Sequence, residues 1–449
     1  MMGVMMSKHT LGRRAVVIGS GMGGLFSATV LARHFDEVIV LDRDHEPTTV
    51  DARGAVPQGH QFHVLLPGGL QAMCDWFPGF TDDLVAAGGV PMMFGRDFYA
   101  YTTLGKSYSI QAHVPDAFET GEYTYVQSRP QLELLVRRRV ADLDNVSFRY
   151  RTLADRPLLD DTGNVAGVMI RGGEPIHADL VIDASGRNSL AAQWLPDMGY
   201  ATAPETYVNC DITYASVVCE PENWDAFDGS VVFVMASEDG EHASRAGAVV
   251  KMPDGKWLLN LTGRYGDFPS KDWVAFRDFG RTLVHPFFDE MADTVTPVGD
   301  IKTYRMPRAV RHHYEQVERF PEGILPLGDA VCFFNPTHGQ GMSSAAGQAR
   351  GLQGLLAERA ANAGGLTGLA MDFFPVAEEW VRGPWILAAM GDFANPKCTG
   401  DFPDADLPDL ILLGDVAQLA ATSPEAGAFV GSISTLRRPL SAIRDFSPA

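Results

Sequence analysis

The chain has 449 residues, of which 46% are hydrophobic and 20% charged, values typical of a folded enzyme with more than one subdomain. Its 56 acidic residues outnumber the 36 basic ones, and the net charge of −20 argues against nucleic acid or anionic lipid as a primary partner. No apolar stretch reaches the roughly 18 residues of a membrane span, and the N-terminal residues lack the apolar core of a secretory signal.

A strand, a glycine turn and a helix form the first predicted unit. Residues 15–18 are a short apolar run typical of a buried strand, and Gly19-Ser20-Gly21-Met22-Gly23-Gly24 follows it and fits GxGxxG. A helical pattern comes next, and a second apolar strand at 38–41 ends on Asp42. Such a turn lets the backbone approach a pyrophosphate, and the terminal acid binds ribose hydroxyls. The unit predicts a dinucleotide site, without separating NAD from FAD, at Gly19, Gly21, Met22, Gly23, Gly24, Asp42 and Arg43.

Two later segments also end apolar strands on an acid and a glycine. The strand at 180–182 is followed by Asp183-Ala184-Ser185-Gly186, and the strand at 323–327 by Gly328-Asp329. The second segment continues through Pro336-Thr337-His338-Gly339-Gln340-Gly341-Met342 into a helix rich in alanine, serine and glycine. Open α/β sheets bind their ligands at such strand ends.

In order and spacing, these three segments resemble the flavoprotein monooxygenases typified by para-hydroxybenzoate hydroxylase. The resemblance implies an α/β fold: a glutathione-reductase-like, FAD-binding Rossmann fold with an inserted antiparallel β-sheet substrate domain and a C-terminal helical region. It implies that the GxGxxG turn holds the ADP half of FAD and that Asp329 binds the ribityl chain. A helix starting near Gly341 would direct N–H groups at the negative charge of reduced flavin. The residues expected near the flavin are Asp183, Gly186, Gly328, Pro336, Gly339, Gln340, Gly341 and Met342.

Two further segments narrow the resemblance. Arg129-Pro130-Gln131-Leu132 is similar to the family's Arg-x-x-Leu helix, whose arginine approaches FAD, although a solvated surface arginine is the alternative. The run Arg53-Gly54-Ala55-Val56-Pro57-Gln58-Gly59-His60 resembles the bacterial polyketide epoxidases, which oxidise alkenes in polyether pathways. This implies a cofactor role for Arg53 and a flavin-facing wall that includes Gln58 and His60.

The rest of the chain is divided by its pattern of strands and helices. The FAD-binding domain is expected at 13–85, 120–205 and 300–370, the substrate-binding sheet at 86–119 and 206–299, and a helical region at 371–449. Strands at 212–215, 231–234, 248–250 and 257–261 predict an antiparallel meander, followed by a helix at 273–284. Helices are expected at 377–390 and 410–421. Four apolar residues of the sheet favour a lipophilic substrate or form ordinary core: Phe233, Met235, Trp257 and Leu259.

The resemblance implies an FAD-dependent monooxygenase that inserts one oxygen atom from O2 into an apolar small molecule through a C4a-hydroperoxyflavin. NAD(P)H, or reduced flavin from a partner reductase, would supply the electrons. Cys332 replaces a histidine of many aromatic hydroxylases, which favours epoxidation of an alkene in a polyketide or terpenoid secondary-metabolite pathway. That step needs no general base, and no catalytic acid or base is assigned. An aromatic hydroxylase, a geranylgeranyl-reductase-like reductase or dehydrogenase, and a flavin carrier stay open as alternatives.

Five scattered cysteines show no metal-ligand spacing. They predict a reduced cytoplasmic setting with inert thiols. His60, His63, His312, His313 and His338 show no metal-ligand pattern either, so no metal is predicted.

Overall fold

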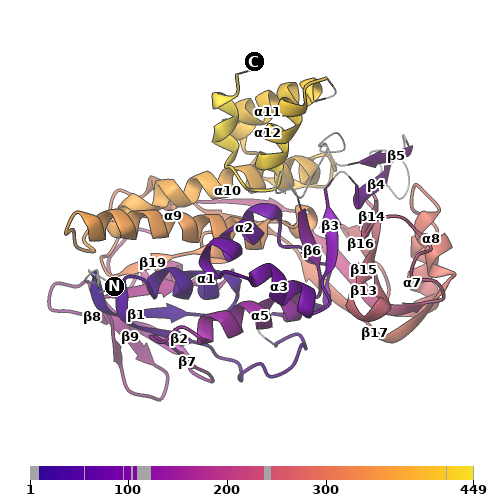
Figure 1. The fold of residues 1–449 in the computed structure, drawn as a ribbon. Helices are drawn as coiled ribbons and strands as arrows, with labels where there is room; N and C mark the ends of the chain where they lie inside the picture. Colours follow the sequence, from indigo (N-terminus) through magenta and orange to yellow (C-terminus); the bar gives the residue numbers. More distant parts are fainter. Residues whose placement is uncertain are drawn as a thin grey trace, which may run out of the picture.

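Two large sheets lie side by side, and a helical unit projects from them near the C-terminus (Figure 1). The computed structural model describes residues 10–54, 56–94, 96–102, 105–108, 123–236, 244–420 and 422–447. Ala55 of the epoxidase-like run and the expected domain boundary at 119–120 therefore lie outside the described residues.

A parallel five-stranded sheet forms the centre of the first part, in the order β19-β11-β1-β2-β7. Residues 15–18 of the middle strand are buried, as expected for an apolar strand that is covered on both faces. The strands expected at 15–18, 38–41 and 180–182 are confirmed. Because all five strands are parallel, their carboxyl ends meet at one edge of the sheet. The strands are β1 (Gly12–Ile18), β2 (Phe35–Leu41), β7 (Val146–Arg149), β11 (Leu180–Asp183) and β19 (Ile324–Pro326).

Helices pack on this sheet, and α1 contacts both α5 and α9. On another side, β9 of a three-stranded antiparallel sheet contacts β11. One apolar core runs through these elements and into the long C-terminal helix α10. The elements are α1 (Met22–Leu31), α2 (Pro67–Trp76), α3 (Phe80–Ala86), α5 (Arg129–Ala141), α6 (Leu190–Trp194), α9 (Gly341–Ala361), β8 (Ala154–Leu159), β9 (Val165–Ile170) and β10 (Ile176–His177).

The second part is a seven-stranded sheet in the order β17-β13-β16-β15-β14-β4-β5. The expected strands are present, and the expected antiparallel meander is confirmed for β14, β15 and β16. It is wrong for β13, which lies beyond β16, and the other neighbour of β14 is β4, in parallel. Since β13 is buried on both faces, it fits the interior of the sheet, between β16 and β17. The strands are β4 (Phe98–Thr102), β5 (Gly105–Tyr108), β13 (Ile212–Pro221), β14 (Val231–Val234), β15 (Ala246–Met252), β16 (Lys256–Arg264) and β17 (Val295–Met306).

Shorter elements join the two parts. Helices α7 and α8 pack on the outer face of the seven-stranded sheet, and the helix expected at 273–284 ends early, at Gly280. Two small sheets have the orders β20-β18-β12-β21 and β3-β6. The elements are α7 (Trp273–Gly280), α8 (Phe287–Ala292), β3 (Val90–Met93), β6 (Tyr123–Val126), β12 (Glu205–Asn209), β18 (Ala309–His312), β20 (Cys332–Phe333) and β21 (Thr399–Gly400).

The C-terminal region is helical, as expected, and its last segment packs onto the first part. The two expected helices are confirmed as α10 (Leu369–Phe393) and α11 (Leu407–Leu419), and a third, α12 (Pro424–Ser434), was not expected. After α12, the carbonyl oxygen of Leu436 lies 1.9 Å from where a Cβ on Gly68 of α2 would stand, so only glycine fits there. No helix in the described ranges is long and apolar enough to cross a membrane.

Candidate functional site

The predicted cofactor motifs meet at the carboxyl edge of the parallel sheet. Gly19 follows β1, Asp42 follows β2, and Gly328 lies just beyond β19. A Cβ added to Gly23 would stand 3.8 Å from the Cα of Gly328, so the first turn of α1 lies against the second motif. Segments about 300 residues apart in the sequence thus form one site, as open α/β sheets do at strand ends.

The three spaced glycines of the first motif have different surroundings. Gly19 has a φ of +98°, and a Cβ there would stand 2.4 Å from the carbonyl oxygen of Ala184. A Cβ on Gly24 would stand 1.9 Å from the carbonyl oxygen of Gly19. Around Gly21, by contrast, no atom lies within 4 Å of the Cβ position. Gly19 and Gly24 are therefore needed for packing, whereas Gly21 leaves open space beside the helix N-terminus, where a phosphate group binds best.

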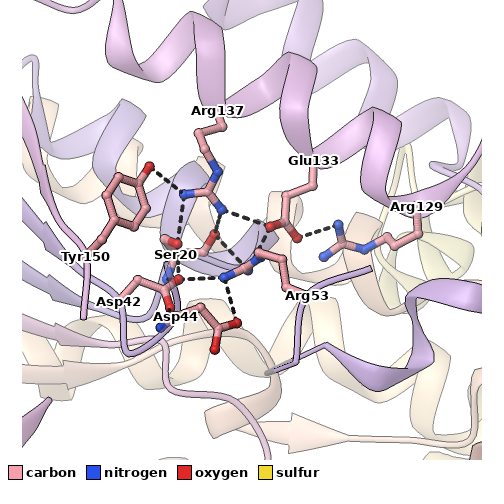
Figure 2. Close-up of polar contacts among 8 residues, drawn as sticks. All are labelled: Ser20, Asp42, Asp44, Arg53, Arg129, Glu133, Arg137 and Tyr150. Carbon is pink, nitrogen blue, oxygen red and sulfur yellow. Dashed lines mark hydrogen bonds and ion pairs between the residues drawn. The ribbon is translucent and has the colours of Figure 1, made fainter. Parts of the chain in front are cut away.

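Asp42 lies in a buried network of charged side chains (Figure 2). Its carboxylate accepts hydrogen bonds from Arg53 Nη1 at 2.7 Å and from the Ser20 hydroxyl. Ion pairs with Arg53 and a hydrogen bond from Ser20 keep the pKa of Asp42 below its usual value, although burial opposes them. Arg43, in contrast, is exposed and lies outside this network.

Arg129, at the start of α5, is buried and pairs with Glu133 at 2.7 Å. The alternative of a solvated surface arginine is therefore wrong. Its charge also opposes the rise that burial causes in the pKa of Asp329, the acid of the Gly328-Asp329 segment.

Asp183 is fully buried and shapes its own turn. Its carboxylate accepts four hydrogen bonds, from the hydroxyl and N–H of Ser185, from the Ser189 hydroxyl and from the N–H of Ala191, at 2.5 to 3.0 Å. Through these bonds the Asp183 side chain fixes the loop that carries Gly186, and Gly186 itself is partly exposed.

Asp329 is half-buried, and its carboxylate has no hydrogen-bond donor among the described residues. Burial raises its pKa to about 6, although Arg129 and Arg187 oppose the shift. A carboxylate without donors at a strand end is suited to accept hydroxyl groups of a ribityl chain. The structure thus agrees with the role that the sequence predicts for this residue, and that role stays a proposal.

The pKa of Asp329 predicts a pH dependence of FAD binding. Hydroxyl donors favour the ionised carboxylate, so we expect FAD affinity to rise as pH increases through about 6. In the apoprotein the sign is opposite: the raised pKa adds stability below 3.8 that is lost as pH rises to about 6. Titration of apoprotein with FAD at several pH values measures the first effect. Asp329→Asn should bind FAD more weakly and show no such dependence, and a variant with unchanged affinity and pH profile would contradict this role.

The loop before α9 is held by Asn335, a buried residue that the sequence analysis did not single out. Its side-chain oxygen accepts from the N–H and hydroxyl of Thr337 at 3.1 and 2.7 Å, and from the Tyr214 hydroxyl at 3.1 Å. Its side-chain amide donates to Asp392 of α10 at 2.6 Å, and Asp392 also pairs with Arg264 of β16. The loop is thus anchored to the seven-stranded sheet through Tyr214 and to the C-terminal helix α10 through Asp392.

The loop turns at Gly339, which has a φ of +65°, and α9 begins at Gly341 as expected. Pro336 and Met342 are partly exposed, whereas Gln340 is buried and reaches the carbonyl oxygen of Ser434 at 3.5 Å. The N–H groups of the first turn of α9 therefore point out of a fixed loop, which makes this helix end a site for negative charge.

Of the expected flavin-facing wall, Gln58 is half-buried and His60 is exposed. Gln61, three residues after Gln58, makes the buried contacts instead. Its amide oxygen accepts from the Ser216 hydroxyl at 2.6 Å, and its amide group donates to the carbonyl oxygen of Lys302 at 3.1 Å. Asn260 completes the cluster by donating to Ser216 at 2.7 Å. Gln61 thus joins the segment after β2 to β13 and β17, at one edge of the seven-stranded sheet.

The face of the sheet that contacts this segment is apolar beyond β16. Phe233 packs on Phe62 and Phe98, with ring centroids 5.9 and 5.5 Å apart. Of the four sheet residues expected near a substrate, only Phe233 lies on this face. Trp257 and Leu259 point to the opposite face under α7 and α8, because alternate residues of a strand face opposite ways, and Met235 is exposed.

The donor set fits FAD. The open space at Gly21 and the first turn of α1 suit a diphosphate, and Asp329 suits a ribityl chain. Two guanidinium nitrogens, Nε of Arg53 and of Arg137, are buried beside the first motif without a hydrogen-bond partner. Buried donors without acceptors are uncommon in folded proteins, and a diphosphate bound beside the first motif would supply acceptors for these two.

Comparisons with known proteins agree with this geometry. The family model described as FAD binding domain matches residues 13–370. Protein Rv3254 of Mycobacterium tuberculosis is 32% identical over 400 residues, which cover 86% of this chain and 81% of that protein. Kynurenine 3-monooxygenase of Salinispora tropica is 24% identical over 348 residues, covering 74% of this chain and 70% of that protein. The solved structure of PqsL, described as a probable FAD-dependent monooxygenase from Pseudomonas aeruginosa, has 17% identity and a TM-score of 0.62 over 85% of this chain and all of its own, and shows the shared fold.

Proposed function

We propose, from the premise that this chain belongs to the FAD binding domain family, that it is a monooxygenase that inserts one oxygen atom from O2 into an apolar organic substrate. Its fold and its relatives are those of the para-hydroxybenzoate-hydroxylase-like enzymes. Within that class, we assign epoxidation of an alkene, in a polyketide or terpenoid secondary-metabolite pathway, as the reaction.

The apolar face of the seven-stranded sheet carries the substrate part of this proposal. Phe62, Phe98 and Phe233 form a continuous row of aromatic rings, and Gln61 holds the first of them close to the sheet. Such a face excludes water and binds hydrocarbon, because burial of apolar surface drives association. A Cβ added to Gly339, in the loop that Asn335 anchors, would stand 2.9 Å from Val64, which belongs to the same apolar cluster as Phe62 and Phe233. The flavin ring is expected at this loop.

The polar groups at this junction favour epoxidation. Gln61, Ser216 and Asn260 are an amide, a hydroxyl and a second amide, which stay neutral at ordinary pH. Burial lowers the pKa of His63 to about 4, so its imidazole is neutral and a weak base. Oxygen transfer to an alkene requires no proton abstraction, whereas phenol hydroxylation benefits from a general base.

FAD, when bound and reduced, supplies the oxygen-activating chemistry. The chain supplies orientation, charge and a dry surface. The N–H groups that begin α9 stabilise negative charge at the end of the loop before this helix. Asp392 and Tyr214 keep that loop in place through Asn335. Hydroxylation of an aromatic ring is the second candidate reaction, favoured by the similarity to kynurenine 3-monooxygenase.

The proposal is tested by reducing the FAD-loaded protein without oxygen and then admitting isotopically labelled O2 with a substrate panel of polyenes and phenols. Reduction is tried with NADPH, with NADH and with a flavin reductase, which separates the electron sources. We expect one labelled oxygen atom in an epoxide of a polyene. A labelled phenol product would favour the hydroxylase, and substrate turnover without label would identify a reductase or dehydrogenase. If reoxidation by O2 releases only hydrogen peroxide and no oxygenated product with every substrate, the monooxygenase proposal is contradicted.

A further inference from the structure

Glu133 of α5 gathers three arginines around one carboxylate (Figure 2). Its oxygens lie 2.7 Å from Arg53 Nη2, 2.7 Å from Arg129 Nη1 and 2.8 Å from Arg137 Nη2. The exposed fractions of these four side chains lie between 5% and 9%. Arg129 and Arg137 stand one helical turn before and after Glu133, so all three project from one face of α5. Asp42 and Asp44 also pair with Arg53, at 2.7 and 3.5 Å, so three carboxylates balance the three guanidinium groups. Among them, Glu133 is the one that contacts all three arginines.

Arg137 reaches that motif directly. Its Nη1 donates to the Ser20 hydroxyl at 2.8 Å and its Nη2 to the Ser20 carbonyl oxygen at 2.7 Å. Its guanidinium also lies near the rings of Phe148 and Tyr150, 5.5 and 5.9 Å from their centroids. These contacts are to uncharged groups, so Glu133 is the carboxylate that orients Arg137. The buried, unpartnered Nε atoms of Arg53 and Arg137 add two donors that require an acceptor.

Several protein donors already bind one carboxylate oxygen of Asp42, where a ribose hydroxyl would also bind. Its Oδ2 atom accepts from Arg53 Nη1 at 2.7 Å, from the Ser20 hydroxyl and, at 3.3 Å, from the Ser20 N–H. A carboxylate oxygen has two lone pairs, so these donors already saturate it. The other oxygen, Oδ1, accepts from the N–H of Asp44 at 2.8 Å and has room for one more donor. A ribose that binds both carboxylate oxygens through its two hydroxyls must therefore displace a donor from Oδ2. Arg53 can leave and still keep its ion pair with Glu133.

We propose that Glu133 is a positioning residue that holds Arg53 and Arg137 for the diphosphate of FAD, and that Arg53 leaves Asp42 when the adenosine ribose binds. In this scheme Arg137 is an FAD-binding residue, and Glu133 acts through both arginines. The inference rests on FAD binding and not on oxygen transfer, so it can fail while the proposed reaction stands, and the reverse.

The first test compares Arg137→Met with Arg138→Met. Arg138 is the next residue of α5, is exposed and carries the same charge, so the second variant controls for net charge. Flavin fluorescence during titration of apoprotein with FAD gives the dissociation constant, and the melting temperature of the apoprotein reports folding. We expect at least about tenfold weaker FAD binding for Arg137→Met and less than about twofold change for Arg138→Met. Equal constants for the two variants would overturn the role of Arg137.

Glu133→Gln is tested in the same assay, and FAD binding at least about tenfold weaker is expected. If Glu133 acts by holding Arg53, the double variant Arg53→Met with Glu133→Gln should lose less affinity than the sum of the single losses. Strict additivity would overturn the positioning role. If Glu133→Gln apoprotein does not fold, Arg53→Met and Arg137→Met and their double variant test the cluster by the same criterion.

The displacement of Arg53 is tested with two ligands. Arg53→Met removes both a diphosphate contact and the competitor for Asp42. We therefore expect weaker binding of FAD but equal or tighter binding of adenosine, which has the ribose and no phosphate. Equilibrium dialysis with adenosine and fluorescence titration with FAD measure the two constants. A parallel loss of affinity for both ligands is the result of a purely structural role and would overturn the displacement.

Discussion

Gly24→Ala is expected to abolish FAD binding and to destabilise the apoprotein by about 3 kcal/mol or more. The new Cβ would stand 1.9 Å from the carbonyl oxygen of Gly19, far inside van der Waals contact. Gly19 cannot move away, because its own Cα faces the carbonyl oxygen of Ala184 at the end of β11 and its N–H bonds to the Leu41 carbonyl oxygen at 2.8 Å. The strain therefore passes into the turn that faces the diphosphate. Urea denaturation of the apoprotein and FAD titration measure the two effects.

Gly21→Ala is the matched control from the same turn. No atom lies within 4 Å of its Cβ position, and its φ of −70° suits any residue. We expect apoprotein stability within about 0.5 kcal/mol of the unmodified protein, as for changes away from packed groups. FAD binding should still weaken, since the methyl group fills the space left for a phosphate. Equal destabilisation by the two substitutions would show that the packing of Gly24 is not the cause.

Asp392→Ala is expected to cost about 3 to 5 kcal/mol of stability, the usual effect of removing one partner of a buried ion pair. Asp392 is 1% exposed, and its loss leaves the charge of Arg264 buried without its carboxylate. Asn335 also loses its 2.6 Å hydrogen bond to Asp392, so the loop before α9 loses its link to α10. Denaturation of the apoprotein measures the stability, and limited proteolysis between 333 and 341 measures the loosening of the loop.

The double variant Arg264→Met with Asp392→Asn separates charge from loop anchoring. It removes both charges and keeps an acceptor for Asn335, so we expect it to be more stable than Asp392→Ala. Arg264→Met alone leaves the carboxylate buried and unpaired and should also be strongly destabilised. If the loss of stability in the double variant equals the sum of the losses in Arg264→Met and Asp392→Asn, the ion pair is not the origin of the effect.

The cofactor edge of the fold could be predicted because its signals are local in sequence. A buried strand, a glycine turn and a terminal acid are adjacent in the chain, and each constrains the next. The predicted strands at 15–18, 38–41 and 180–182 and the start of α9 at Gly341 are confirmed for this reason. The place of β13 in the seven-stranded sheet has no such local signal, since its partners lie more than 35 residues away along the chain.

The residues that the sequence analysis missed depend on distant partners. Glu133 directly follows the Arg-x-x-Leu run, yet its contact with Arg53 appears only when the fold brings Arg53 to it from another segment. Asn335 and Asp392 are 57 residues apart, and the sequence around either residue does not indicate their contact. A signal was available for α12, because Ser423 and Pro424 form a helix start, with the Ser423 hydroxyl accepting from the N–H of Ala426. The glycines of that helix obscured it.

The order β19-β11-β1-β2-β7 has a consequence for biosynthesis. During translation, β11 is complete at residue 183, but the strand that covers its outer edge begins only at Ile324. In between, the ribosome releases five of the seven strands of the second sheet, β13 to β17, while the outer edge of β11 is unpaired. Unpaired strand edges promote aggregation of nascent chains. Because Asp329, where the ribityl chain is expected, and the start of α9 at Gly341 are also synthesised after β11, FAD cannot complete its expected contacts before that point of translation.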